Sequence, residues 1–74
     1  MNYKDRIVRD PKILGGKPVI KGTRIPVNLI LERLSEGISC EELLKMYPTL
    51  RKEDVMAAIA YSAEVIKKEV LVEY

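Results

Sequence analysis

The stretch from Gly15 to Val27 constrains the fold more than any other part of the sequence, because it holds three glycines and two prolines among β-branched residues. Glycine adopts backbone angles that other residues avoid, and proline fixes φ and removes a hydrogen-bond donor. The β-branched side chains suit a pleated surface. We therefore expect a turn, a strand at Val19-Ile20, a second turn at Lys21-Gly22, and an extended segment that enters a helix near Pro26.

A second strand is predicted upstream at Ile7-Val8, because the Asp10-Pro11 pair that follows it favours a turn. Two partners fit this strand equally well, residues 19–20 and residues 23–25. A two-stranded ribbon is only marginally stable by itself in water. We therefore expect the strands of this N-terminal arm, residues 1–26, to pack on another surface, of this chain or of a partner.

Two short helices are predicted after the arm. Apolar residues recur at helical spacing over residues 27–36, and Gly37 is placed to end that helix as its C-terminal cap. Ser39 and Glu42 form the capping-box pattern that begins a second helix over residues 40–47. A proline then ends this second helix.

Two starts compete for the third and longest helix. Thr49 is the better capping side chain, whereas a cap at Arg51 lets Leu50 and Val55 form a hydrophobic staple. We favour the start at Arg51, because it also places the acidic pair Glu53-Asp54 at the positive end of the helix.

The third helix carries almost no polar stripe: between residues 55 and 66 only Ser62, Glu64 and the Tyr61 hydroxyl are polar. A helix of this kind is covered on more than one side. We assign one face to the core: Val55, Ile59, Ser62 and Ile66. We assign another face to an interface with a second molecule, most simply a second copy about a two-fold axis: Met56, Ala57, Ala60 and Ala63. The alternative is that the N-terminal arm folds over this face.

Charge is unevenly divided along the chain. Residues 1–26 hold seven basic and two acidic side chains, a net charge of +5, whereas residues 27–74 have a net charge of −3. A basic arm suits an anionic partner such as DNA, and it equally suits an acidic surface of its own or a neighbouring subunit. If DNA is bound, we expect mainly phosphate contacts, from Lys17, Lys21, Arg24, Arg51 and Lys52. For Arg24 we favour a structural role, as the ion-pair partner of Glu53 or Asp54.

The composition argues against an enzyme. Histidine is absent and Cys40 is the only cysteine, so thiol activation by an imidazole, histidine zinc ligation and an intrachain disulfide are all excluded. We predict no catalytic residue, no metal site and no cofactor. One cysteine favours a reducing cytoplasm, and no apolar run approaches the roughly 18 residues that a membrane span needs. A single domain of 74 residues without a disulfide or a metal site is expected to gain stability by self-association.

The glycine-rich stretch from Gly15 to Val27 resembles the signature of a small prokaryotic family, domain of unknown function 433. Further motifs are similar to the rest of its pattern: Leu29-Ile30-Leu31, Gly37-Ile38-Ser39, Tyr47-Pro48, Glu53-Asp54-Val55, Ala57-Ala58 and Ala60-Tyr61. The resemblance covers residues 6–69, nearly the whole chain. Arg51 departs from the pattern, because a capping serine or threonine is expected there.

That family looks like the VapB-type antitoxins, which have a homeodomain-like helix-turn-helix and are often encoded beside toxins with a PIN-like ribonuclease fold. The resemblance implies a mainly α domain, with a three-helix homeodomain-like helix-turn-helix bundle over residues 27–69, a short N-terminal β hairpin and an apolar tail at residues 70–74. It also implies a partner toxin and binding of the protein to its own promoter DNA. Two other functions stay open, a free-standing helix-turn-helix DNA-binding regulator and a dimerisation scaffold without nucleic-acid contact.

Overall fold

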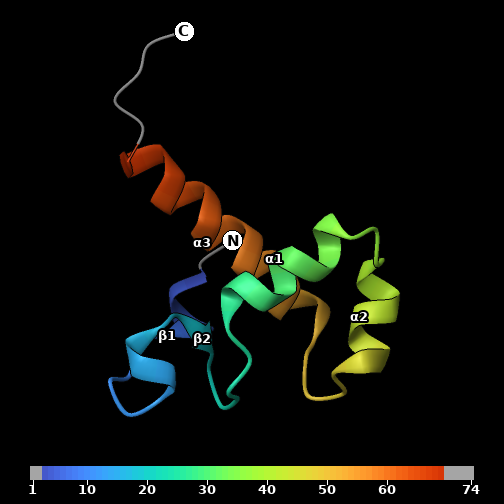
Figure 1. Cartoon of the computed structure of the whole chain (residues 1–74), viewed down its shortest axis with the longest axis horizontal. Helices are drawn as coiled ribbons and strands as arrows, with labels where there is room; N and C mark the ends of the chain where they lie inside the picture. The colour runs from blue at the N-terminus through green and yellow to red at the C-terminus, as the bar shows by residue number, and fades with distance from the viewer. Residues whose placement is uncertain (1–2, 70–74) are drawn as a thin grey trace, which may run out of the picture.

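The computed structural model describes residues 3–69, in which a short hairpin and two 3-10 turns lie beside three helices (Figure 1). The elements in chain order are η1 (Tyr3–Asp5), β1 (Ile7–Val8), η2 (Leu14–Gly16), β2 (Val19–Ile20), α1 (Val27–Ser35), α2 (Cys40–Met46) and α3 (Lys52–Glu69). The predicted apolar tail, residues 70–74, lies outside this range. No helix within residues 3–69 has the length and apolar character that crossing a bilayer requires. The mainly α fold with an N-terminal hairpin is confirmed.

β1 and β2 pair antiparallel, with Ile7 opposite Ile20 and Val8 opposite Val19. Of the two pairings open to the first strand, the one with residues 19–20 is therefore formed. Both residues of β2 are buried, whereas those of β1 are only partly covered. The hairpin thus presents β2 to the core and keeps β1 nearer the surface.

The chain turns back after β2 and leads directly into α1. Gly22 takes a φ of +80° in this turn, in the left-handed region that glycine adopts without strain. The backbone N–H of Ile20 then donates to the carbonyl of Ile25 at 3.0 Å, and that of Val27 donates to the carbonyl of Pro18 at 2.9 Å. These bonds hold the start of α1 against β2.

The core lies where β2 meets the inner sides of the three helices. Its buried residues are Ile20, Val27, Ile30, Leu43, Leu50, Val55 and Ala58. Because every element from β2 to α3 contributes at least one of them, removing any one element would expose the others.

The end of α1 has the geometry that the glycine predicted. Gly37 takes a φ of +90°, its N–H donates to the carbonyl of Leu34 at 3.1 Å, and the N–H of Ile38 donates to the carbonyl of Arg33 at 3.2 Å. These two bonds are the pair of a Schellman motif. The predicted C-terminal cap is confirmed.

The capping box at the start of α2 is also confirmed. The Glu42 N–H donates to Ser39 Oγ at 3.1 Å, and the Ser39 N–H donates to Glu42 Oε1 at 3.3 Å. At the other end of α2, Tyr47 and then Glu36 raise the pKa of the Arg33 guanidinium above its ordinary value, by hydrogen bonding and charge.

α3 begins after Arg51, as favoured from the sequence. The carbonyl of Arg51 accepts the N–H of Asp54 at 2.9 Å, and the carboxylate of Asp54 accepts the N–H of Arg51 through Oδ2, also at 2.9 Å. Asp54 therefore satisfies one of the free amides at this end of the helix, in place of a capping side chain at residue 51. Leu50 and Val55 are both buried in the core.

The side of α3 that faces the core differs from the predicted one. Ile59 and Ile66 are exposed, whereas Ala57 and Ala58 are completely buried. Ala57 lies between Asp54 and Tyr61 on the helix, and both of these residues contact the N-terminal arm. The prediction that Ala57 faces a second molecule is therefore wrong, and on this side of α3 the alternative holds, with the arm folded over the helix. Alanine allows this because its small side chain lets the arm approach closely.

Candidate functional site

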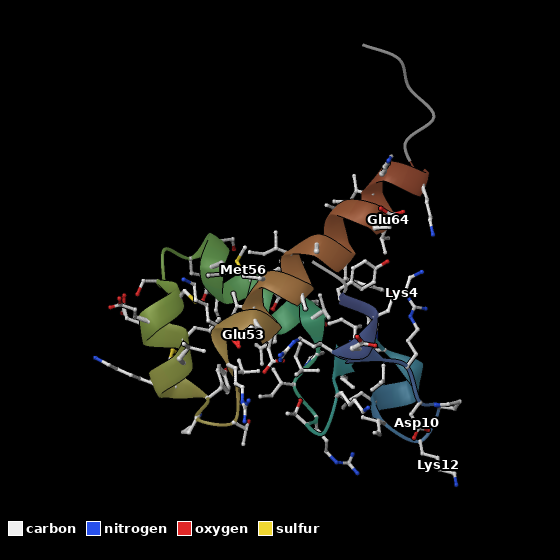
Figure 2. The ribbon with its side chains drawn as sticks, turned by 180° about the vertical axis from the view of Figure 1, so that it is seen from behind. Lys4, Asp10, Lys12, Glu53, Met56 and Glu64 are labelled. Atoms are coloured by element: carbon white, nitrogen blue, oxygen red, sulfur yellow. The ribbon has the colours of Figure 1, made fainter. Side chains whose placement is uncertain are left out.

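An apolar surface runs along the outer side of α3. Large side chains are exposed there, Met56 by 46%, Ile59 by 42% and Ile66 by 58%, and Ala63 lies among them. These residues recur at intervals of three and four, so they share one side of the helix. Met56 is labelled near the start of α3 in Figure 2, and the second half of the helix extends past α1 and α2 (Figure 1). We call Met56, Ile59, Ala63 and Ile66 the apolar stripe.

The apolar stripe overlaps the interface that the sequence predicted. Met56 and Ala63 belong to it, and Ala60 is half-buried beside it. Ile59 and Ile66 join the surface although the sequence pattern placed them in the core. Helical periodicity was the available signal for this stripe, but on a helix without a polar stripe it does not say which side faces solvent.

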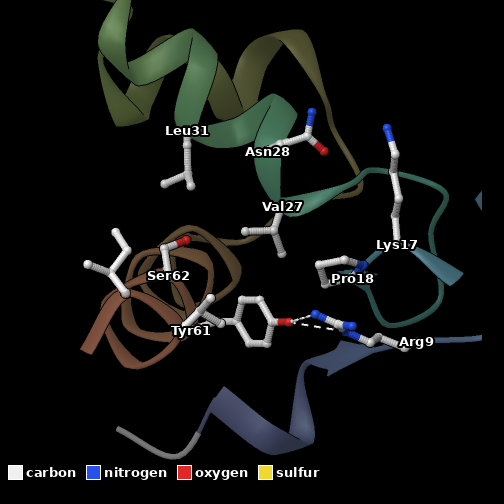
Figure 3. Close-up of a pocket in the computed structure, with 10 residues that line it drawn as sticks. Arg9, Lys17, Pro18, Val27, Asn28, Leu31, Tyr61 and Ser62 are labelled. Carbon is white, nitrogen blue, oxygen red and sulfur yellow. Dashed lines mark hydrogen bonds between the residues drawn. The ribbon is translucent and has the colours of Figure 1, made fainter. Parts of the chain in front are cut away.

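A pocket of about 490 Å³ opens between the N-terminal arm, α1 and α3 (Figure 3). We call it the α1–α3 pocket. Its walls are mainly apolar and include Val27, Leu31 and Val65. Arg9 and Lys17 stand on the arm side, with the Tyr61 hydroxyl opposite Arg9 in Figure 3. Ligand sites in proteins are commonly apolar clefts of this size with a few placed polar groups.

Arg9 is held in place by Tyr61. Its Nε donates to the Tyr61 hydroxyl at 3.1 Å, and its Nη2 donates to the same oxygen. The guanidinium carbon lies 5.8 Å from the centre of the Tyr61 ring, and the Tyr3 ring meets that ring edge-on with centroids 5.6 Å apart. The sequence gives no local signal for this contact, because 52 residues separate Arg9 from Tyr61.

Asp54 and Arg6 join the arm to the start of α3. Arg6 Nη1 donates to Asp54 Oδ1 at 2.9 Å, and Asp54 is only 6% exposed. The predicted partner of this acid, Arg24, is exposed and does not form the pair. Arg24 lies after β2, whereas Arg6 precedes β1, which packs against α3. The predicted ion pair between the arm and α3 is present, but its arginine is Arg6 and not Arg24.

Most of the predicted DNA-contacting residues surround one end of the molecule. A shallow hollow of about 300 Å³ is lined by Asp5, Arg6, Asp54 and Lys21, which places Lys21 beside the start of α3. The loop from β2 to α1 and the loop from α2 to α3 point to the same end in Figure 1.

These two loops carry the other cations of that end. They hold Arg24 and Arg51, and Lys52 is the first residue of α3. Among residues 3–69, no carboxylate forms a salt bridge with Lys21, Arg24, Arg51 or Lys52. Lys17 is separate, because it lines the α1–α3 pocket.

A family model described as a protein of unknown function (DUF433) matches residues 7–62. The chain belongs to this DUF433 family. A crystal structure of a DUF433 member protein from Anabaena variabilis is similar, with a TM-score of 0.80, 34% sequence identity, and coverage of 88% of this chain and 64% of that one.

Two relatives are similar in sequence. The uncharacterised protein y4eO of Sinorhizobium fredii is 36% identical over 59 residues, which is 80% of this chain and 27% of that protein. An uncharacterised protein of Archaeoglobus fulgidus is 67% identical over 24 residues, 32% of this chain and 67% of that protein. The chain thus spans about a quarter of the length of the Sinorhizobium protein and 64% of the Anabaena chain.

In this DUF433 chain, the described side chains include no group of three or more Cys, Asp or Glu residues placed to hold a metal ion. Cys40 is a free, partly buried thiol at the first position of α2. The sites with defined shape and charge are therefore the apolar stripe, the α1–α3 pocket and the basic end around the start of α3.

Proposed function

We propose that this DUF433 chain is the antitoxin-like component of a prokaryotic toxin–antitoxin pair, which as a dimer binds and neutralises a PIN-like ribonuclease. The observation that carries the interaction role is the apolar stripe of α3. The resemblance of the family to VapB-type antitoxins supplies the kind of partner. Exposed contiguous apolar surface on a small protein usually marks an interface with another protein.

The size of the stripe sets what kind of dimer it supports. Met56, Ile59 and Ile66 are each about half exposed, so burying the rest of each side chain contributes about 1 kcal/mol, or about 6 kcal/mol over two copies. Association costs roughly 4–15 kcal/mol in lost freedom. The free energy gained from the stripe alone is therefore close to the smallest cost of association. Close approach of the two helices at Ala60 and Ala63 has to add further contacts. We expect a dimer that dissociates on dilution.

Binding to promoter DNA is the second candidate function, with α2 and α3 as the helix-turn-helix pair. The cations of the basic end favour it, because none of them forms a salt bridge within residues 3–69, although Asp5 and Asp54 line the same hollow as Lys21. The outer side of α3 argues against base reading, since it presents methyl groups and a thioether rather than hydrogen-bond donors. We therefore infer mainly phosphate contacts. Four such contacts predict a slope of about −3.6 for log K against log salt.

Co-expression with the protein encoded beside this chain tests the proposal. We expect the two to purify as a stable complex, in which the ribonuclease activity of the neighbour is suppressed. Free elution of this chain, with the neighbour fully active in its presence, would contradict the antitoxin role. A gel-shift titration against the promoter, repeated over a range of salt, separates the other candidates. A steep salt dependence without a protein partner supports the free-standing regulator, and a dimer that binds neither supports the scaffold.

A further inference from the structure

We propose that the α1–α3 pocket binds an acidic apolar segment of the partner protein, with a large apolar side chain inside the pocket and a carboxylate on Arg9 and Lys17. This inference rests on the proposed function, because it names the part of the toxin that the antitoxin would hold. It assigns the pocket a ligand class separate from the DNA phosphates and from the dimer contact on α3.

The interior of the pocket favours an apolar side chain. Val27 and Leu31 form its wall on α1, and Val65 and Ile66 form its wall on α3. Its volume of about 490 Å³ accommodates one or two large side chains. Ile66 also belongs to the apolar stripe, so the pocket borders the surface assigned to the dimer contact. A small polar ligand would leave these walls against water and gain nothing from them.

The charge at the rim favours a carboxylate. Two of the ten lining residues, Arg9 and Lys17, are cationic, and none of the ten is acidic. Among residues 3–69, neither cation forms a salt bridge. An acidic group entering the pocket would therefore meet two positive charges without displacing a carboxylate of residues 3–69.

Arg9 is oriented before any ligand arrives. The Tyr61 hydroxyl accepts from Nε and Nη2, which fixes the plane of the guanidinium, and no group within residues 3–69 accepts from Nη1. Guanidinium groups bind carboxylates through planar, directed N–H donors, so an arginine fixed in one orientation loses less side-chain freedom on binding. Lys17 is exposed at the rim of the pocket and adds a second positive charge.

Peptide titration tests the ligand class directly. The probe is acetyl-Leu-Glu-Leu-Leu-Glu-Leu-amide, and the matched peptide has glutamine in place of both glutamates. Binding is followed by calorimetry and by the shifts of backbone amide signals in ¹H–¹⁵N spectra. We expect the glutamate peptide to bind more tightly and to shift the amides of Leu31 and Val65. Equal binding of the two peptides, or no shift at these amides, would overturn the proposal.

Variants separate the two cations from a general charge effect. Arg9→Gln should weaken glutamate-peptide binding about tenfold, because it removes a charge-assisted hydrogen bond. Lys17→Gln should weaken it about threefold, as expected for an exposed ion pair, and it keeps the test valid if loss of the Tyr61 contact unfolds the first variant. Lys12→Gln is the matched control, since this exposed residue does not line the pocket, and it should bind as the wild type does. Equal weakening by all three would contradict a local site.

Two further experiments test other sources of the carboxylate. Octanoate that binds as tightly as the glutamate peptide would show a site for small amphipathic acids and overturn the assignment to a protein segment. In co-expression, Lys17→Gln should reduce recovery of the neighbouring protein. If the complex is unaffected, the pocket proposal fails and the antitoxin proposal stands. If the wild type binds the peptide in the pocket but never its neighbour, the proposed function fails, and the partner-protein assignment of the pocket fails with it.

Discussion

Replacing Asp54 with alanine should destabilise the fold far more than removing the neighbouring acid, Glu53, at the start of α3. The Asp54 carboxylate is 6% exposed and accepts two hydrogen bonds, from the Arg6 guanidinium and from the N–H of Arg51, each at 2.9 Å. Hydrogen bonds to a charged group contribute about 1.5–3 kcal/mol each. The Arg6 side chain is 34% exposed, so water replaces part of its lost contact. The expected loss is therefore about 2–4 kcal/mol in the free energy of unfolding.

That loss is large for a chain of this length. A domain of 74 residues has a free energy of unfolding of roughly 4–11 kcal/mol, so Asp54→Ala should remove about a fifth of it or more. The melting temperature should fall by about 10–30 °C, at roughly 4–8 °C for each kcal/mol. Urea unfolding followed by circular dichroism measures the change at fixed protein concentration.

A matched control and a double-mutant cycle identify the cause. Glu53→Ala removes an exposed acid from the same helical turn, so only its interaction with the helix dipole is lost, about 0.3–1 kcal/mol. Combining Asp54→Ala with Arg6→Ala should give a coupling energy of about 1 kcal/mol. If Asp54→Ala and Glu53→Ala destabilise equally, or if the coupling is zero, the account of how the arm is fixed to α3 is refuted.

Three further changes have expected outcomes. Gly37→Ala should lower the free energy of unfolding by about 1–2 kcal/mol, because alanine is strained at a φ of +90°, and an unchanged urea midpoint would contradict the Schellman cap. Ser39→Ala should cost about 1 kcal/mol by removing the acceptor for the Glu42 amide, and Ser35→Ala, at an exposed helical position, is its control. Arg24→Ala should change stability by less than about 0.5 kcal/mol, since this arginine forms no ion pair within residues 3–69, and a larger loss would restore its predicted structural role.

The features that the sequence predicted correctly are local. The cap at Gly37, the capping box of Ser39 and Glu42, and the start of α3 after Arg51 each depend on residues within a few positions of one another. Backbone geometry and nearby side chains decide them, and tertiary packing adds little. The hairpin was expected from its local turn residues, but the choice between the two possible pairings of the first strand depends on the rest of the fold.

The features that the sequence missed are long-range. Arg6 and Arg24 both belong to the basic arm, and only the packing of β1 on α3 selects Arg6 as the partner of Asp54. The exposed side of α3 was assigned correctly at Met56 and wrongly at Ala57, Ile59 and Ile66, because a helix without a polar stripe offers no contrast between its sides. The α1–α3 pocket needs Arg9 and Tyr61 brought together from distant parts of the chain.

Sedimentation equilibrium of the wild type and of Ile59→Glu tests most directly whether the apolar stripe is an interface. We expect the wild-type mass to rise with concentration toward twice the 8.4 kDa of one chain, and Ile59→Glu to stay at the monomer mass. Ile59 is 42% exposed in the single chain, so the variant should keep its circular dichroism spectrum, and Lys68→Glu on the same helix should associate as the wild type does. A wild type that stays at 8.4 kDa at every concentration, or an Ile59→Glu variant that associates normally, would contradict the account.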